Sequence, residues 1–310
     1  MVWPLTLTLS PSGARGGFMR ILVSALFVSM VAFAGEPVAA AGQAAAASNA
    51  PPLAETTVTA PRDESENALV GDYQQPKWTD RRRFPGVRLY VAPPGAATFE
   101  FWGEGKVTSD AEPARLRTMY EVSFGLGHRL QLDLYLRTES NGADVLRIES
   151  ERLELRWALA DWGVLWGNPT LYLEYIRQTE GPHKAEVKVL LGGALSPRWF
   201  WGANLFFETE LWGDQGHEYG AVAGVAYSLV DSKLSLGAET RVEVVDTRAT
   251  RLTPLEVEWL IGPSLSWRPV PQAHVLFTAY LGPGFSRGAG GDPFSARLVF
   301  QPSLVIGWRL

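Results

Sequence analysis

Apolar and polar residues alternate with a period of two through most of this chain, from residue 98 to its end. In one clear example, Leu132, Leu134 and Leu136 share one face of an extended strand. Asp133 and Arg137 lie on the opposite face. A period of two belongs to β-strands that have one apolar and one polar face. The pattern therefore predicts half-buried strands, repeated many times.

Glycine, proline and polar clusters divide this region into twelve alternating segments, an even number, as single-chain bacterial membrane barrels require. The sequence therefore predicts an all-β fold: a transmembrane antiparallel up-and-down β-barrel of about 12 strands over residues 98–310. A lipocalin-like barrel or a β-sandwich also alternates, but it turns its apolar face inward and has fewer strands. We expect strands at 98–108, 115–126, 129–139, 146–159, 170–179, 185–192, 198–212, 218–229, 233–245, 255–267, 273–283 and 294–310.

An export signal precedes the alternating region. Met19 is followed by an arginine and by an apolar run over 21–34, with small residues at its end. About fourteen apolar residues are too few for a spanning helix, which needs about 20. We interpret residues 1–41 as a misplaced translation start plus a signal peptide, cleaved near Ala34 or Ala41.

Residues 42–97 differ in composition from the alternating region, because they are rich in alanine, proline and polar residues. Such a composition predicts a flexible periplasmic N-terminal tail. Within it, Val87, Leu89 and Val91 are compatible with one short strand or with a plug of the barrel lumen.

The tail contains a short segment, 55–62, with the sequence Glu-Thr-Thr-Val-Thr-Ala-Pro-Arg. It resembles the TonB box of TonB-dependent transporters, which binds an energy-transducing periplasmic protein by adding a β-strand to it. The resemblance implies that Thr57, Val58 and Thr59 form a partner-binding strand. The chain departs from that family, because it has neither room for the family's plug domain nor its 22 strands. A Thr/Pro linker is the alternative interpretation.

The last segment keeps its apolar face to the final residue, through Leu304, Ile306, Trp308 and Leu310. This ending resembles the C-terminal signature by which the barrel-assembly machinery recognises outer-membrane barrels, although leucine replaces the usual phenylalanine. We therefore expect a protein of the outer membrane of a Gram-negative envelope, with lipid around its apolar face.

In a bilayer the apolar face must meet lipid, so the polar face lines the lumen. Inward bases gather on the twelfth and first four strands, whereas inward acids gather on the fifth to tenth. The candidate acidic lumen residues are Glu174, Glu208, Glu210, Glu239, Glu243, Glu256 and Glu258; the basic ones are Arg115, Arg117, Arg129, Arg137, Arg156 and Arg297.

Two outcomes are compatible with such a lumen. Opposed charges in a narrow barrel can join in an ionic network that fills it. Across an open constriction, they instead create a transverse field that orients dipolar solutes. We expect a narrow, porin-like channel or transporter for small solutes. The alternative is a closed structural or docking barrel whose periplasmic tail binds a partner.

Enzyme chemistry is not expected. The hairpin near residue 270 brings Ser266 opposite His274, which is a possible nucleophile and base for a hydrolase, but no acid lies behind the histidine. Asp214, His217 and Glu218 form an outer-loop cluster that is better interpreted as a solvated loop. With four histidines and no cysteine, we expect no metal and no cofactor. A net charge of -5 without a basic run argues against nucleic acid as a partner.

Two further segments, Tyr120-Glu121-Val122-Ser123-Phe124-Gly125-Leu126-Gly127-His128-Arg129-Leu130-Gln131-Leu132 and Leu171-Tyr172-Leu173-Glu174-Tyr175, resemble parts of outer-membrane barrels. The barrels in question are related to the meta-pathway phenol-degradation transporter group. The resemblance implies a barrel linked to uptake of small, hydrophobic solutes. The resemblance lies in the sequence pattern of the β-hairpins, and it assigns no functional residue to this chain.

Overall fold

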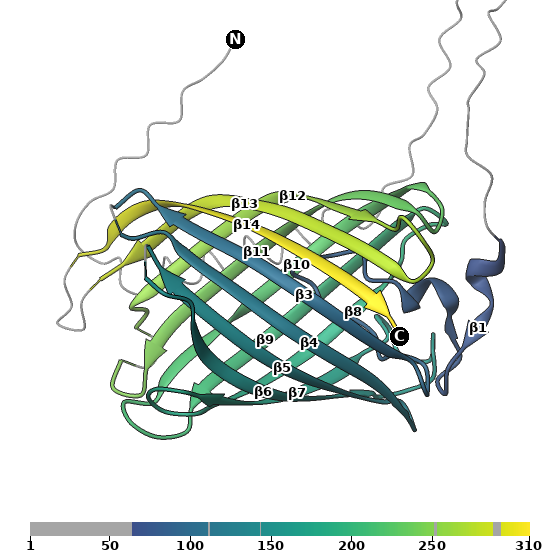
Figure 1. Ribbon diagram of the computed structural model, residues 1–310, viewed down its shortest axis with the longest axis horizontal. Coiled ribbons are helices and arrows are strands. Elements are labelled where there is room, and N and C mark those ends of the chain that lie inside the picture. The colour runs from purple at the N-terminus through teal and green to yellow at the C-terminus, as the bar shows by residue number, and fades with distance from the viewer. Residues whose placement is uncertain (1–63, 111, 143, 251–252, 288–292) are drawn as a thin grey trace, which may run out of the picture. The chain divides into compact units, whose positions relative to one another are not determined.

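Twelve antiparallel strands close into a barrel in the computed structural model, which describes residues 64–110, 112–142, 144–250, 253–287 and 293–310 (Figure 1). Each strand pairs with its neighbours in sequence, and the first barrel strand, β3, pairs with the last, β14. This confirms the predicted fold. Within these described ranges, no helix is long and apolar enough to cross a bilayer.

The strand limits agree with the predicted ones to within three residues at every end. The strands are β3 (Ala97–Thr108), β4 (Arg115–Gly127), β5 (Leu130–Asn141), β6 (Arg147–Ala158), β7 (Thr170–Gln178), β8 (Lys184–Ala194), β9 (Trp199–Glu210), β10 (Gly216–Val230), β11 (Leu234–Thr247), β12 (Glu256–Trp267), β13 (Ala273–Ser286) and β14 (Ser295–Arg309).

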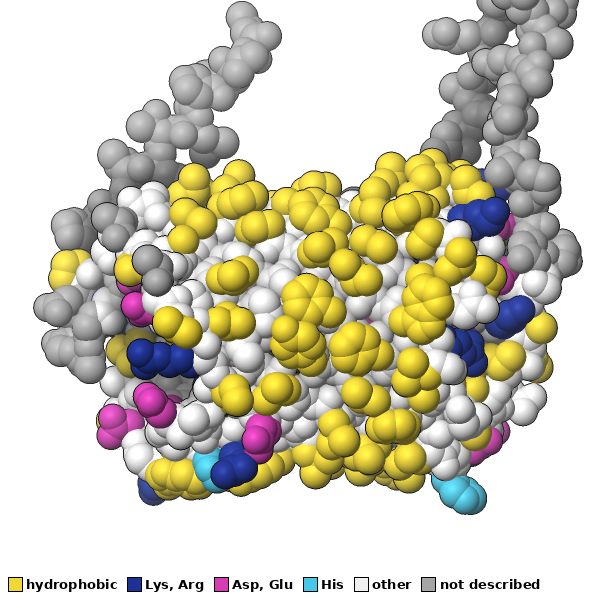
Figure 2. All heavy atoms as spheres, in the orientation of Figure 1, with side chains coloured by type: hydrophobic (Ala, Val, Ile, Leu, Met, Phe, Trp, Pro, Cys, Tyr) yellow, Lys and Arg dark blue, Asp and Glu magenta, His cyan; other side chains and the backbone are white. Residues whose placement is uncertain are grey.

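The outer face of the barrel is apolar and exposed (Figure 2). Leu134 of β5 lies directly opposite Val122 of β4 and Leu153 of β6. The two leucines keep 45% and 48% of their surface exposed. Large apolar side chains in such a continuous band are stable only against hydrocarbon, so the band is the lipid-facing surface.

Tryptophans mark one boundary of this band. Trp157, Trp199, Trp267 and Trp308 stand at the strand ends nearest the short turns and the C-terminus, and each is 45–50% exposed. Aromatic girdles of this kind lie at the membrane–water interface. Four of the five connections at this end are two to five residues long, and 159–169 is longer. Because the short turns of such barrels are periplasmic, we assign this end to the periplasm.

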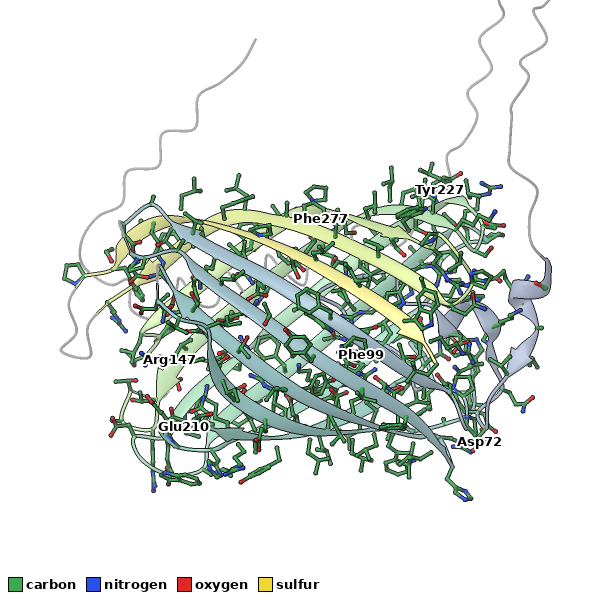
Figure 3. All side chains as sticks on the ribbon, viewed as in Figure 1. Asp72, Phe99, Arg147, Glu210, Tyr227 and Phe277 are labelled. Carbon is green, nitrogen blue, oxygen red and sulfur yellow. The ribbon has the colours of Figure 1, made fainter. Side chains whose placement is uncertain are left out.

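The two ends of the barrel are easy to follow in Figure 3. Arg147 and Glu210 lie at the outer end, near the loops that join strand pairs, and Asp72 lies at the periplasmic end. Phe99 and Phe277, 39% and 42% exposed, lie on the lipid-facing surface between them.

Residues 64–96, which we call the plug, occupy the periplasmic end of the barrel: β1 lies at its mouth (Figure 1), and Phe84, Val87 and Tyr90 are buried inside it. The sequence predicts a flexible tail here, but the structure shows an ordered segment. Val87, Leu89 and Val91 belong to a plug of the lumen, which is one of the two alternatives given for them above. The plug comprises 3-10 helix η1 (Glu64–Asn67), β1 (Leu69–Val70), β2 (Gln75–Pro76) and 3-10 helix η2 (Lys77–Asp80), followed by extended chain.

Burial of aromatic and branched side chains explains why this segment is ordered. Phe84 and Val87 pack against Val222 and Ala226 on the inner face of β10. Trp78 packs against Phe200 and Tyr90 in a second cluster. These contacts remove large apolar groups from water, which offsets the entropy cost of ordering the chain. The expected partner strand Thr57, Val58 and Thr59 and the expected signal region 1–41 lie outside the described residues.

Glycines on the inner wall make room for the plug. A Cβ added at Gly202 of β9 would lie 2.7 Å from a methyl carbon of Leu89. A Cβ added at Gly224 of β10 would lie 2.9 Å from the ring of Phe84. At both sites the plug takes the volume that a wall side chain would otherwise fill.

Candidate functional site

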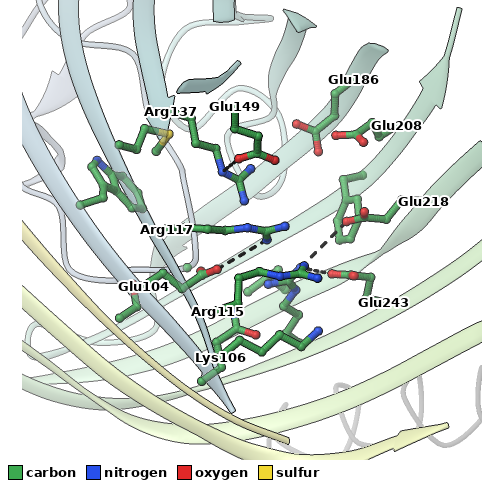
Figure 4. Close-up of a pocket in the computed structure, with 18 of the residues that line it drawn as sticks. Glu104, Lys106, Arg115, Arg117, Arg137, Glu149, Glu186, Glu208, Glu218 and Glu243 are labelled. Atoms are coloured by element: carbon green, nitrogen blue, oxygen red, sulfur yellow. Dashed lines mark hydrogen bonds and ion pairs between the residues drawn. The ribbon is translucent and has the colours of Figure 1, made fainter. Parts of the chain in front are cut away.

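Above the plug, the polar inner face encloses a vestibule of about 540 Å³ (Figure 4). Its walls are inward-facing residues of all the barrel strands, because alternation turns every second side chain into the lumen. Its floor is made by Pro85, Gly86 and Arg88 of the plug. The vestibule therefore ends at the plug, and the plug separates it from the periplasmic end.

Ten basic and nine acidic side chains line the vestibule, so its lining is close to neutral overall. The two signs are not evenly mixed. Strands β14 and β3 to β6 supply six of the bases and two of the acids, whereas β7 to β12 supply three bases and six acids. One side of the vestibule is thus rich in guanidinium groups and the other rich in carboxylates.

The basic side is organised by arginines of β4 and β5 (Figure 4). The Arg117 guanidinium donates to Glu139 at 2.6 Å and lies 3.8 Å from Glu104. The Arg137 guanidinium lies 2.8 Å from Glu149. Each arginine is held by a neighbouring carboxylate while its charge stays at the cavity surface.

The acidic side is a ladder of four glutamates on four adjacent strands, β7 to β10. Glu174 is directly opposite Glu186, Glu186 opposite Glu208, and Glu208 opposite Glu218. Like charges in such positions destabilise a sheet unless they are neutralised. Lysines on β8 supply counter-charge, and Lys184 donates to Glu208 at 2.6 Å.

Eight of the predicted lumen residues line the vestibule: Arg115, Arg117, Arg137, Arg297, Glu174, Glu208, Glu243 and Glu256.

Four others lie elsewhere on the inner face or at its rim. Glu258 accepts a hydrogen bond from Lys106 at 2.9 Å, and Glu210 accepts one from the Gly216 backbone at the outer rim at 2.8 Å. Glu239 and Arg156 lie lower in the barrel and contact the plug.

Arg129 is not on the lumen wall. It lies in the two-residue turn between β4 and β5, with a φ of 64°, and its guanidinium is 2.9 Å from the Asp161 carboxylate in another periplasmic turn. The expected position of Arg129 was wrong because the strand starts one residue later, at Leu130.

Hydrogen bonds from the wall fix the floor of the vestibule. Asn204 of β9 clamps the Arg88 backbone: its Oδ1 accepts from the Arg88 N–H at 2.8 Å, and its Nδ2 donates to the Arg88 carbonyl. The Gly86 N–H donates to Glu239 at 2.8 Å. These bonds satisfy buried backbone groups that no sheet partner reaches.

Arginines of the plug add a charged attachment. Arg82 donates to Glu100 at 2.6 Å, and Arg88 forms an ion pair with Glu121. Both guanidinium groups also lie against the Trp102 indole, with Cζ atoms 3.9 Å and 4.7 Å from the ring centre. Such cation–π contacts strengthen when water is excluded. Trp102 and Asn204 were not singled out from the sequence, although a tryptophan on the polar face of a strand is a usable signal.

The predicted serine–histidine pair does not form. Ser266 is opposite Leu276, not His274, and its hydroxyl donates to the Arg82 carbonyl at 3.1 Å. His274 instead contacts Glu100 at 2.9 Å. Both side chains belong to the attachment of the plug, so this hydrolase candidate is removed.

The outer-loop cluster also separates. His217 contacts Asp246 of β11 at 2.9 Å rather than Asp214 or Glu218. Among the described residues, no group of three side chains is placed to hold a metal ion.

No protein-family model matches the chain, and no curated protein matches it. Solved structures do. The COG4313 outer membrane channel from Pseudomonas putida F1 is 12% identical, with a TM-score of 0.52 over 74% of this chain and 100% of that one. The CymD monoaromatic hydrocarbon channel is 8% identical, with a TM-score of 0.40 over 70% and 89%. The outer membrane channel DcaP of Acinetobacter baumannii is 10% identical, with a TM-score of 0.34 over 72% and 100%.

The likeness to the Pseudomonas putida channel shows the fold, an outer-membrane β-barrel. Together with the apolar band and its tryptophan boundary, the fold places this chain in the outer membrane.

Proposed function

We propose that this protein is an outer-membrane channel for small polar solutes, closed on its periplasmic side by its own plug. One observation carries the proposal: the floor of the vestibule is made by plug residues, not by the barrel wall. A barrel whose charges filled the lumen would have no such cavity. Here the strands enclose an open space, and a separate segment closes it.

The vestibule favours small and polar solutes. A volume of about 540 Å³ suits solutes of monosaccharide or amino-acid size. The separated arginine and glutamate sides favour molecules that carry both a positive and a negative group, because each end finds its counter-charge. The hydrophobic solutes implied by the family resemblance fit this charged lining less well.

Passage to the periplasm requires the plug to move. The plug is attached by hydrogen bonds and ion pairs that water can replace, and by three apolar clusters that must open when it moves. Whether the segment Thr57, Val58 and Thr59 recruits an energy-transducing partner for this step stays a prediction.

An engineered disulfide tests the path. A Cβ added at Gly202 would lie 2.9 Å from Cγ1 of Val87, so the two side chains point at each other in direct contact, which a disulfide between these positions requires. The chain has no cysteine of its own, so Val87→Cys with Gly202→Cys introduces the only pair. Conductance in planar bilayers and solute flux into liposomes are measured before and after reduction.

We expect conductance and flux when the disulfide is reduced and their loss when it forms, while each single-cysteine variant behaves alike in both conditions. Equal conductance of the oxidised and reduced pair would show that the path does not pass the plug. No conductance or flux from any form, wild type included, would overturn the channel proposal and favour a closed docking barrel.

A further inference from the structure

A smaller cavity of about 130 Å³ lies between the plug and the barrel wall, near the periplasmic ends of the strands. Seven arginines and one histidine line it, against only two carboxylates, those of Asp80 and Glu100. We call this cavity the arginine chamber. Its basic character contrasts with the balanced lining of the vestibule, from which the plug residues 85–88 separate it.

The two carboxylates of the arginine chamber are already engaged. Glu100 accepts from Arg82 at 2.6 Å and contacts His274 at 2.9 Å. Asp80 forms an ion pair with Arg309, near the end of the last strand. Asp80 also attracts the charge of Arg268, but its ion pair is with Arg309.

Two guanidinium groups of the chamber have no carboxylate within 4 Å among the described residues: Arg83 of the plug and Arg268 of the turn after β12. Arg83 donates to the Trp78 carbonyl at 2.9 Å and lies over the Phe200 ring, with its Cζ 3.7 Å from the ring centre. Arg268 donates to the Pro271 carbonyl. Backbone carbonyls satisfy these donors in part. Asp231 attracts the charge of Arg83 and Asp80 attracts that of Arg268, but among the described residues neither carboxylate forms an ion pair with its arginine.

This arrangement is electrostatically costly. Burial, with added repulsion from Arg268, lowers the pKa of Arg83 to about 10, and burial lowers the pKa of Arg268 as well. Both groups remain protonated at neutral pH, and both residues line the arginine chamber, so two positive charges border it. Arg83 also borders a neighbouring cavity that Glu66 and Asp231 line. An anion bound between them would gain charge-assisted hydrogen bonds that no protein group supplies.

We propose that the arginine chamber binds one small oxyanion, a carboxylate, phosphate or sulfate group, that enters from the periplasmic end and contacts Arg83 and Arg268. The volume of about 130 Å³ admits such a group. Because Arg83 belongs to the plug and Arg268 to the barrel, the bound anion links the two. It therefore strengthens the attachment of the plug.

The proposal goes beyond the channel function, since the anion binds whether or not the barrel conducts. Calorimetric titration of the purified full-length barrel with sodium sulfate, against sodium chloride at equal ionic strength, measures the binding. Glycerol 3-phosphate then represents a free phosphate, and phosphatidylglycerol in nanodiscs represents a lipid headgroup.

We expect saturable binding of one sulfate and a dissociation constant raised about tenfold or more by Arg268→Gln, because a charge-assisted bond is lost. Arg268 lies in a turn, so this variant keeps the barrel core intact. Arg147→Gln, at the outer end of the barrel, is the matched control and leaves binding unchanged.

Bound sulfate should also slow tryptic cleavage after Arg82 and Arg83, because it holds the plug in the barrel. Of glycerol 3-phosphate and phosphatidylglycerol, the ligand that binds more tightly identifies the source of the natural anion, provided that Arg268→Gln weakens the binding of that ligand. Sulfate binding no tighter than chloride, or equal binding by wild type and Arg268→Gln, would overturn the proposal.

Discussion

Single glycines on the inner wall decide where the plug can lie. The space at Gly202 and Gly224 is filled by plug side chains, so even one methyl group added there competes with the plug. Single polar side chains also hold the plug in place: the Asn204 amide forms hydrogen bonds with both the backbone N–H and the carbonyl of Arg88. The plugged state thus depends on a few positions that can be tested one at a time.

The substitution Gly202→Ala should loosen the plug by about 1–3 kcal/mol, because the new methyl overlaps Leu89 and Val87. Limited trypsin digestion with mass spectrometry checks this through faster cleavage after Arg82 and Arg83. Gly103→Ala is the control: the added Cβ meets no atom closer than 3.9 Å. Equal protection of the two variants would contradict the steric fit.

The substitution Asn204→Leu leaves the Arg88 N–H and carbonyl buried without their partner, which costs about 1–3 kcal/mol per unsatisfied group. We expect more frequent open events in single-channel records and faster tryptic cleavage of the plug. Gln178→Leu, which changes a vestibule amide on β7, should leave both readouts at the wild-type level. If the Asn204→Leu variant opened no more often than wild type, the hydrogen bonds of Asn204 would not be what holds the plug.

At the scale of elements, the strands could be predicted from the sequence because their pattern is local. Lipid on one side and a polar lumen on the other impose period two on every strand, as Leu134 and its neighbours show. The plug has no such period. Its order comes from contacts such as Phe84 with Val222, about 140 residues apart in the chain. The aromatic residues at 73, 78, 84 and 90 are the sequence signal for an ordered segment, and a prediction of disorder from the polar composition alone does not take them into account.

The candidate lumen residues also divide into those that the local period of two predicts and those that depend on strand ends or on the plug. Positions inside long alternating strands, such as Arg117 and Glu208, face the vestibule because the period places them there. Arg129 sits where strand and turn meet, and a shift of one residue at a strand end moves a side chain off the wall. The partners of Glu239 could not be predicted, since they belong to the plug.

The lipid-facing band gives a prediction at this scale. Leu134→Arg should lower the free energy of unfolding by about 2–4 kcal/mol, because it places a charge against hydrocarbon in the middle of β5. Urea unfolding in lipid vesicles, followed by tryptophan fluorescence, measures the change. Val145→Arg, in the outer loop where the side chain is 78% exposed, should be neutral. Equal stability of the two variants would place Leu134 outside the bilayer.

For the whole molecule, the separation of charge across the vestibule should set ion preference. Arg117→Gln with Arg137→Gln removes two bases from one side, so the reversal potential in a salt gradient should shift toward cations. Glu208→Gln with Glu218→Gln should shift it toward anions.

The measurement is made in about 0.1 M salt and repeated in about 1 M, where the Debye length falls from about 10 Å to about 3 Å and the shift should shrink. Shifts of the same sign in both double variants would show that the lining charges do not select the permeating ion.

The pairing of the first barrel strand with the last has a consequence for biogenesis. The plug immediately precedes β3 and bonds to Glu100 on it, yet two of its other hydrogen-bond partners, Asn204 and Glu239, lie on β9 and β11, far around the cylinder from β3. The compartment that houses the plug does not exist until β14 has joined β3. The plug is therefore made before every barrel strand but is among the last parts to reach its native place, and until then its arginines and aromatic rings remain available to periplasmic chaperones.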